Sequence, residues 1–185
     1  MSLFCFTIEE ESCMSKNIFV LARQIAQAKT VTFLWILALS IALPAITHQQ
    51  YVTGPLVNAL LIIATVLLGP FEAVMIGLFP SVVALSTGLL PLPLAPMVPF
   101  IMIGNALLVA CVSFIRSKSF SLAVFVAALV KFTFLYGTVT LLMKTLLPST
   151  LVASLSVMMG YPQFVTAVAG GVIAFLFLKG TKNYE

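Results

Sequence analysis

The sequence predicts an all-α membrane protein, with six transmembrane helices in one compact bundle and both termini cytoplasmic. Its composition is the first reason: 62% of the 185 residues are hydrophobic and 8% are charged, whereas about a quarter of the residues of an ordinary soluble domain carry a charge. The second is the run of residues 51–114, in which Glu72 is the only formal charge. About 20 apolar residues already cross a bilayer, so this run must cross several times.

Residues 1–30 are expected to form a cytoplasmic or interfacial segment before the first span. Residues 9–11 are all glutamate, where a signal peptide would need positive charge. Within residues 17–29, apolar side chains recur at helical spacing opposite Arg23 and Lys29. This pattern predicts a short amphipathic helix that lies on the membrane surface.

Six apolar runs separated by helix breakers are the expected spans of a membrane domain over residues 31–180. Gly69-Pro70 separates the second from the third, because proline cannot continue a helix. A proline-rich connection over residues 90–96 separates the third from the fourth. Residues 151–159 are apolar but too short to cross, which predicts a re-entrant or interfacial helix. The six runs cover about residues 31–46, 55–68, 71–89, 97–115, 121–143 and 163–178.

The basic residues support this order of spans and give it an orientation. Most of them lie before the first span, between the fourth and fifth, and after the sixth. Six crossings bring these three places to one side of the membrane, and loops rich in Lys and Arg are cytoplasmic. Residues 181–185 would then be a cytoplasmic tail. The basic residues concerned are Arg23, Lys29, Arg116, Lys118, Lys179 and Lys182.

Lys131 is a charged residue near the middle of the fifth span, where insertion costs about 2.5–3.5 kcal/mol. The chain has no Asp, and Glu72 is the only acid in the membrane-embedded part. Three interpretations stay open. Lys131 can bind an anionic group of a substrate, pair with Glu72, or extend along its helix to the interface.

Other polar residues in the spans also have two interpretations. Asn58 and Asn105 can join neighbouring helices through hydrogen bonds or contact a ligand. Thr133, Tyr136 and Thr140 fall on one sector of the fifth span, with Lys131 nearly opposite. That sector can line a cavity, or its hydroxyl groups can bond to carbonyls of their own helix.

The residue inventory argues against an enzyme and against a metal or cofactor site. The single histidine, His48, has no second ligand near it in the sequence. Acyl transfer and metal-assisted chemistry both need clustered reactive groups. Cys5, Cys13 and Cys111 are scattered, which indicates free thiols. A clustered basic face for nucleic acid is also missing from the sequence pattern.

The order of these features resembles the S components of energy-coupling factor (ECF) transporters, over about residues 30–180. S components are small six-helix subunits that bind vitamins or metals for import. The similarity rests on Gly69-Pro70, on the Gly-Leu-Leu-Pro-Leu-Pro sequence of residues 88–93, and on Pro-Phe-Ile-Met-Ile-Gly-Asn at residues 99–105. Ala38 and Ala42 match the Ala-x-x-x-Ala motif with which S components contact the transmembrane T subunit.

The resemblance implies a prokaryotic plasma-membrane protein that captures a small organic micronutrient with an anionic group at the outer face. A T subunit and two ATPase subunits would then drive import, since this chain has no phosphate-binding GxxxxGK[ST] motif. Two alternatives stay open: a membrane scaffold without a ligand, and a secondary carrier that works alone. The substrate-binding residues implied by the resemblance are His48, Gln49, Gln50, Tyr51, Asn58, Asn105, Lys131, Tyr136, Thr140 and Gln163.

Overall fold

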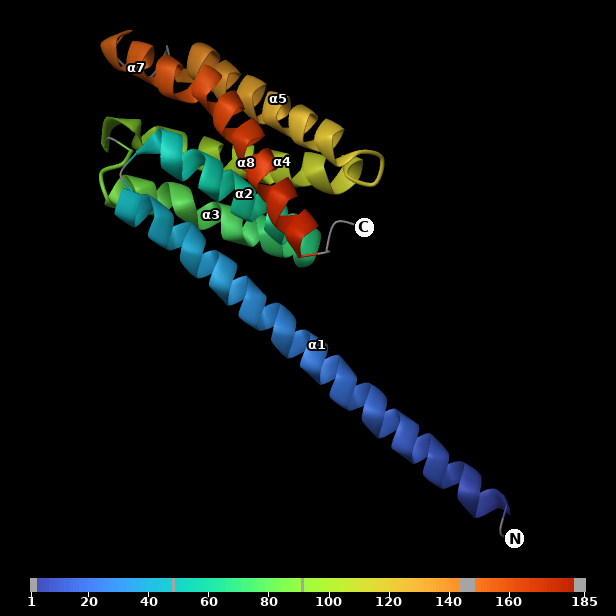
Figure 1. The fold of residues 1–185 in the computed structure, drawn as a ribbon. Coiled ribbons are helices and arrows are strands. Elements are labelled where there is room, and N and C mark those ends of the chain that lie inside the picture. Colours follow the sequence, from blue (N-terminus) through green and yellow to red (C-terminus); the bar gives the residue numbers. More distant parts are fainter. Residues whose placement is uncertain (1–2, 48, 91, 144–148, 182–185) are drawn as a thin grey trace.

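The computed structural model describes residues 3–47, 49–90, 92–143 and 149–181, and this part of the chain is helical without strands (Figure 1). Five segments within it are long and apolar enough to cross a membrane. A further apolar helix of 17 residues, α3, lies between two of them. The α-helices are α1 (Leu3–Thr47), α2 (Gln50–Leu67), α3 (Pro70–Ser86), α4 (Val98–Ile115), α5 (Phe120–Thr138), α7 (Ser149–Met159) and α8 (Tyr161–Gly180).

The first helix differs from the prediction. Instead of a short surface helix followed by a separate span, α1 runs without a break from Leu3 to Thr47. The physical reason is the absence of a breaker, since neither Gly nor Pro occurs before Pro44. The N-terminal half of α1 extends away from the bundle in Figure 1.

The turn between α2 and α3 forms where the sequence predicts it. Gly69 has a φ of 114°, a left-handed conformation that glycine adopts without a steric penalty. Pro70 then starts α3, where its missing N–H and fixed φ are favourable. Two residues therefore reverse the chain and place α2 beside α3.

Short helical segments flank the cavity described below. The proline-rich connection forms a 3₁₀ helix, Leu92–Met97, directly before α4. A π-helical turn, Val139–Met143, extends the end of α5. The short apolar segment before the last span is helical, as α7, and α8 begins after Gly160.

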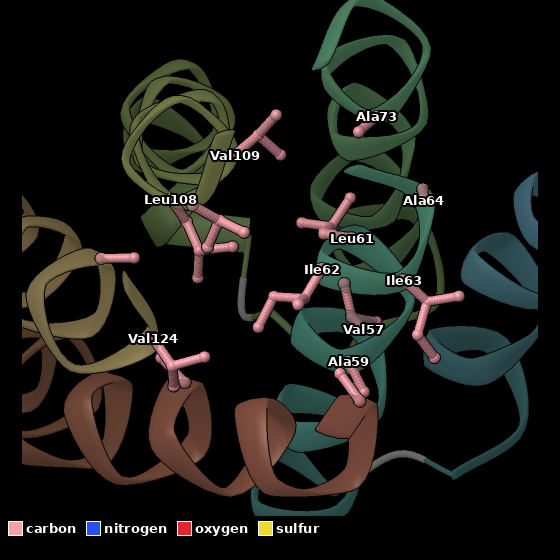
Figure 2. Close-up of a cluster of buried hydrophobic side chains, with 14 of the residues drawn as sticks. Val57, Ala59, Leu61, Ile62, Ile63, Ala64, Ala73, Leu108, Val109 and Val124 are labelled. Carbon is pink, nitrogen blue, oxygen red and sulfur yellow. The ribbon is translucent and has the colours of Figure 1, made fainter. Parts of the chain in front are cut away.

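Helix α2 is the centre of the bundle and packs against α1, α3, α4 and α8. Leu61, Ile62 and Ala64 of α2 are almost completely buried. Figure 2 shows side chains of α2 between Leu108 and Val109 of α4 on one side and Ala73 of α3 on the other. A helix buried on nearly all sides must carry apolar residues on nearly all sides, as the sequence of α2 does.

Helices α2 and α8 have the most extensive contact in the bundle. Gly170 makes this approach possible. A Cβ atom at Gly170 would lie 2.7 Å from the carbonyl oxygen of Pro55 and 2.7 Å from Cβ of Asn58. The backbone of α8 therefore lies directly against the turn of α2 that carries Asn58.

Candidate functional site

A cavity of about 670 Å³, including its opening, lies at the end of the bundle where α1 ends and α2 begins. Helices α1, α2, α3, α4, α5, α7 and α8 all contribute to its walls, as does the connection after α3. Small-molecule sites typically have volumes of roughly 300–1,000 Å³. The space is therefore large enough for a small organic molecule.

Lys131 lies at the wall of this cavity, and among the lining residues that the structure describes it alone is charged. Its side chain is 3% exposed. The Nζ atom donates one hydrogen bond of 2.7 Å to Oδ1 of Asn58 and another of 2.7 Å to Oδ1 of Asn105. Two amide oxygens from α2 and α4 thus solvate a cation that α5 carries, which lowers the cost of its burial.

Asn105 extends this cluster to a fourth helix. Its Nδ2 atom donates a 2.8 Å hydrogen bond to the carbonyl oxygen of Gly77 in α3. Gly77 itself lies close, because a Cβ atom there would lie 3.2 Å from Cβ of Asn105. The two asparagines therefore join helices, as one interpretation of the sequence holds, and they also line the cavity.

Two of the three interpretations of Lys131 are wrong: it neither extends along its helix to the interface nor pairs with Glu72. Lys131 does not reach an interface, since it is almost completely buried and its ammonium group is held by α2 and α4. Glu72 lies at the start of α3 and lines a separate groove together with Lys29 and Phe71. The ammonium group is satisfied by amides because the helix register places Asn58 and Asn105, and not Glu72, at its level.

Two glutamine side chains that line the cavity bind the end of α7. Nε2 of Gln50 donates to the carbonyl oxygen of Met158 at 2.9 Å, and Nε2 of Gln163 donates to the same oxygen at 3.4 Å. Met158 and Met159 line the cavity beside them. The last turn of α7 is thereby held against the start of α2 and the start of α8.

The structure brings together half of the predicted substrate-binding residues. Gln50, Asn58, Asn105, Lys131 and Gln163 all line the cavity, from four different helices. The structure brings these five to one cavity, and whether they bind a ligand stays a prediction.

The other members of that set that the structure describes do not line the cavity: they are Gln49, Tyr51, Tyr136 and Thr140. Gln49 and Tyr51 are exposed, and Tyr51 is 70% accessible. Tyr136 stacks on Phe132, and Thr140 lies in the π-helical turn that follows α5. Helical spacing separates both from Lys131, because opposite faces of a helix point in opposite directions. His48 lies outside the described residues.

The hydroxyl groups of the polar sector of α5 bond to their own helix. Oγ1 of Thr133 donates to the carbonyl oxygen of Leu129 at 2.9 Å, and Oγ1 of Thr140 donates to that of Tyr136 at 3.0 Å. Such bonds satisfy a hydroxyl group without any neighbour. Of the two interpretations of this sector, local backbone bonding is therefore correct.

Several cavity residues were missed by the sequence analysis. Gly54, Ser81 and Ile101 line the space, as do Thr53 and Met159. Helical spacing was the available signal: Gly54 lies four residues before Asn58, and Ile101 lies four before Asn105. A search along these faces from the two asparagines would have found Gly54 and Ile101.

The described lining of the cavity is mostly apolar with a few polar groups. Within the described ranges, no group of three or more His, Cys, Asp or Glu side chains is placed to hold a metal ion. What the lining offers is one ammonium group, a few amides and hydroxyls, and apolar walls. Comparisons of the chain with family models, with curated proteins and with solved structures find no match.

The structure therefore defines a class at a coarse level. The described part of the chain is helical, with several apolar helices of membrane-spanning length, and its helices form a cavity lined by a buried lysine.

Proposed function

We propose that this protein is the substrate-binding integral membrane subunit of an ECF-type importer. It captures a small organic micronutrient with an anionic group and delivers it with a T subunit and two ATPase subunits. The observation that carries the proposal is the cavity, in which the buried Lys131 is the one charged side chain among the described lining residues. A buried cation costs free energy in a low-dielectric interior, and an anion bound beside it would offset that cost.

In this proposal α3 is the sixth span and the cavity opens at the outer face. Arg116 and Lys118 follow α4, and Lys179 lies in the last turn of α8. These basic residues are at the C-terminal ends of α4 and α8, whereas the cavity is lined by Asn105 from the first half of α4 and by Gln163 from the first turn of α8. Basic loops favour the cytoplasmic side, so the cavity would face outward.

Helix α1 supports the proposed contact with a T subunit. Its membrane-spanning window is only 17% buried in the bundle, the lowest share among the candidate spans. Ala38 is exposed and Ala42 is half-buried, and the large apolar side chains of Leu34, Trp35 and Leu39 are exposed beside them. Small residues at this spacing allow another helix to approach closely.

Copurification tests the proposal. Tagged protein coexpressed with ECF T and ATPase subunits should retain them, and Ala38→Trp should abolish retention because a bulky side chain blocks close helix contact. The matched control is Leu176→Trp, since Leu176 is an exposed residue of α8, and it should leave retention unchanged. Failure of the wild-type protein to associate would contradict the ECF role and favour a scaffold or an independent carrier.

A further inference from the structure

The ammonium group of Lys131 has one hydrogen-bond donor left for a ligand. A lysine ammonium carries three N–H donors and no acceptor. Two of them bond to the Oδ1 atoms of Asn58 and Asn105. No third partner exists among the residues that the structure describes, and Lys131 lines the cavity.

The same contact fixes the orientation of both asparagine side chains. Because an ammonium group can only donate, each amide must face it with the oxygen, so each NH₂ group points elsewhere. The NH₂ group of Asn105 is used, since it donates to the carbonyl oxygen of Gly77. The NH₂ group of Asn58 has no protein partner in the described part of the chain.

The unused NH₂ group of Asn58 is in contact with the cavity. Asn58 is only 2% exposed, yet no fully buried side-chain nitrogen or oxygen of the described residues lacks a hydrogen-bond partner. Nδ2 of Asn58 must therefore be accessible, and the cavity is the space that Asn58 lines. Gly170 holds this side chain in place, because the backbone of α8 packs directly behind it.

We propose that Nζ of Lys131 and Nδ2 of Asn58 together bind one carboxylate group of the substrate in the cavity. This inference rests on the function proposed above. Two neighbouring donors match the two oxygens of a carboxylate, and a charged donor makes the stronger of the two bonds. Asn105 is a positioning residue, since both ends of its amide are already bonded to protein groups.

The charge balance selects a monocarboxylate over a phosphorylated compound. In the described part of the lining Lys131 is the one charged residue, and it can neutralise a single negative charge. A phosphate group carries about −1.5 to −2 at neutral pH, and the excess would be buried without a partner. The body of the ligand would lie against Val57, Leu90 and Ile101, which are apolar residues of the cavity wall.

Three probes with the same phenyl body test this assignment: benzoate, benzamide and phenyl phosphate. Isothermal titration and thermal unfolding of the purified full chain in detergent measure their binding. We expect the wild-type protein to bind benzoate at least about tenfold more tightly than either of the others, a difference of about 1.4 kcal/mol. Equal binding of benzamide, tighter binding of phenyl phosphate, or no binding of any probe would overturn the proposal.

Two variants separate ligand contact from folding. In Lys131→Met, the ratio of the affinity for benzoate to the affinity for benzamide should fall to about one. Asn58→Asp keeps an oxygen beside Lys131 but replaces the donor by an anion, so benzoate binding should be lost while the unfolding temperature does not fall. Retention of the benzoate preference in either variant would refute the assignment.

Copurification with T and ATPase subunits reports on the proposed function separately. If the chain selects benzoate but does not bind these subunits, the carboxylate site is supported and the ECF role is contradicted. If it binds the subunits but shows no carboxylate preference, the ECF role is supported and the carboxylate site is contradicted.

Discussion

At the scale of single residues, the Lys131 cluster shows how a buried charge is stabilised without a counter-ion. Hydrogen bonds to charged groups contribute about 1.5–3 kcal/mol, about twice as much as neutral ones. Lys131 makes two of them, and Asn105 adds a bond to the backbone of α3. The cluster therefore stabilises the bundle and also lines the cavity, because the hydrogen bonds of its three side chains join four helices.

Asn105→Leu tests the structural part of this role. The substitution removes the bond from Lys131 and the bond to Gly77, so we expect a loss of at least about 2 kcal/mol in the free energy of unfolding. Denaturant or thermal unfolding in detergent measures it. Thr133→Val is the control: Thr133 is exposed and bonds only to its own helix, and such changes stay within about 0.5 kcal/mol. Similar effects of both variants would contradict the role given to Asn105.

At the scale of the elements, the contact between α2 and α8 positions Asn58. Helix association in a membrane depends on close packing, because lipid supplies no hydrophobic driving force between helices. Gly170 allows the two backbones to approach at the turn that carries Asn58. The geometry of the cavity therefore depends on a residue that does not line it.

Gly170→Ala should destabilise the protein and weaken benzoate binding. Its Cβ atom would lie 2.7 Å from a backbone oxygen of α2, and such overpacking costs roughly 1–3 kcal/mol. Gly137→Ala is the matched control in α5, where a Cβ atom meets nothing within 4 Å. It should stabilise the helix by roughly 0.5–1 kcal/mol. Unfolding and benzoate titration of both variants give the comparison, and a neutral Gly170→Ala would show that α8 can shift without cost.

At the scale of the whole molecule, the bundle has two different ends. One carries the cavity, the 3₁₀ helix Leu92–Met97 and α7. The other carries the turn between α2 and α3, with Gly69, and the connection between α4 and α5, with its two basic residues. The proposed orientation places the first end outside the cell.

Labelling of single cysteines tests that orientation. In a variant with Cys5, Cys13 and Cys111 replaced by serine or alanine, we expect Leu92→Cys to react with a membrane-impermeant maleimide in intact cells. Leu92 is 77% exposed at the cavity end. Ser117→Cys, in the connection between α4 and α5, should react only after the cells are permeabilised. The reverse pattern, or labelling of both in intact cells, would contradict the orientation.

Much of the architecture was predictable because its causes are local in the chain. Apolar runs of sufficient length predict helices of membrane-spanning length, and Gly69-Pro70 predicts their tightest turn. The opposite placement of Lys131 and Thr133 on α5 followed from the helical period alone. The continuity of α1 was missed because polar residues before the first span were taken as a boundary, although no helix breaker is present.

The sequence by itself determined that the chain is apolar and helical, where most of its helices begin and end, and that Lys131 needs partners. Only the tertiary structure decided which partners these are. Asn58, Asn105 and Lys131 lie on three helices, and their meeting depends on how each helix is rotated and shifted against the others. Packing at residues such as Gly170 sets that rotation and shift. The pattern of residues within a single helix does not predict how that helix is placed against its neighbours.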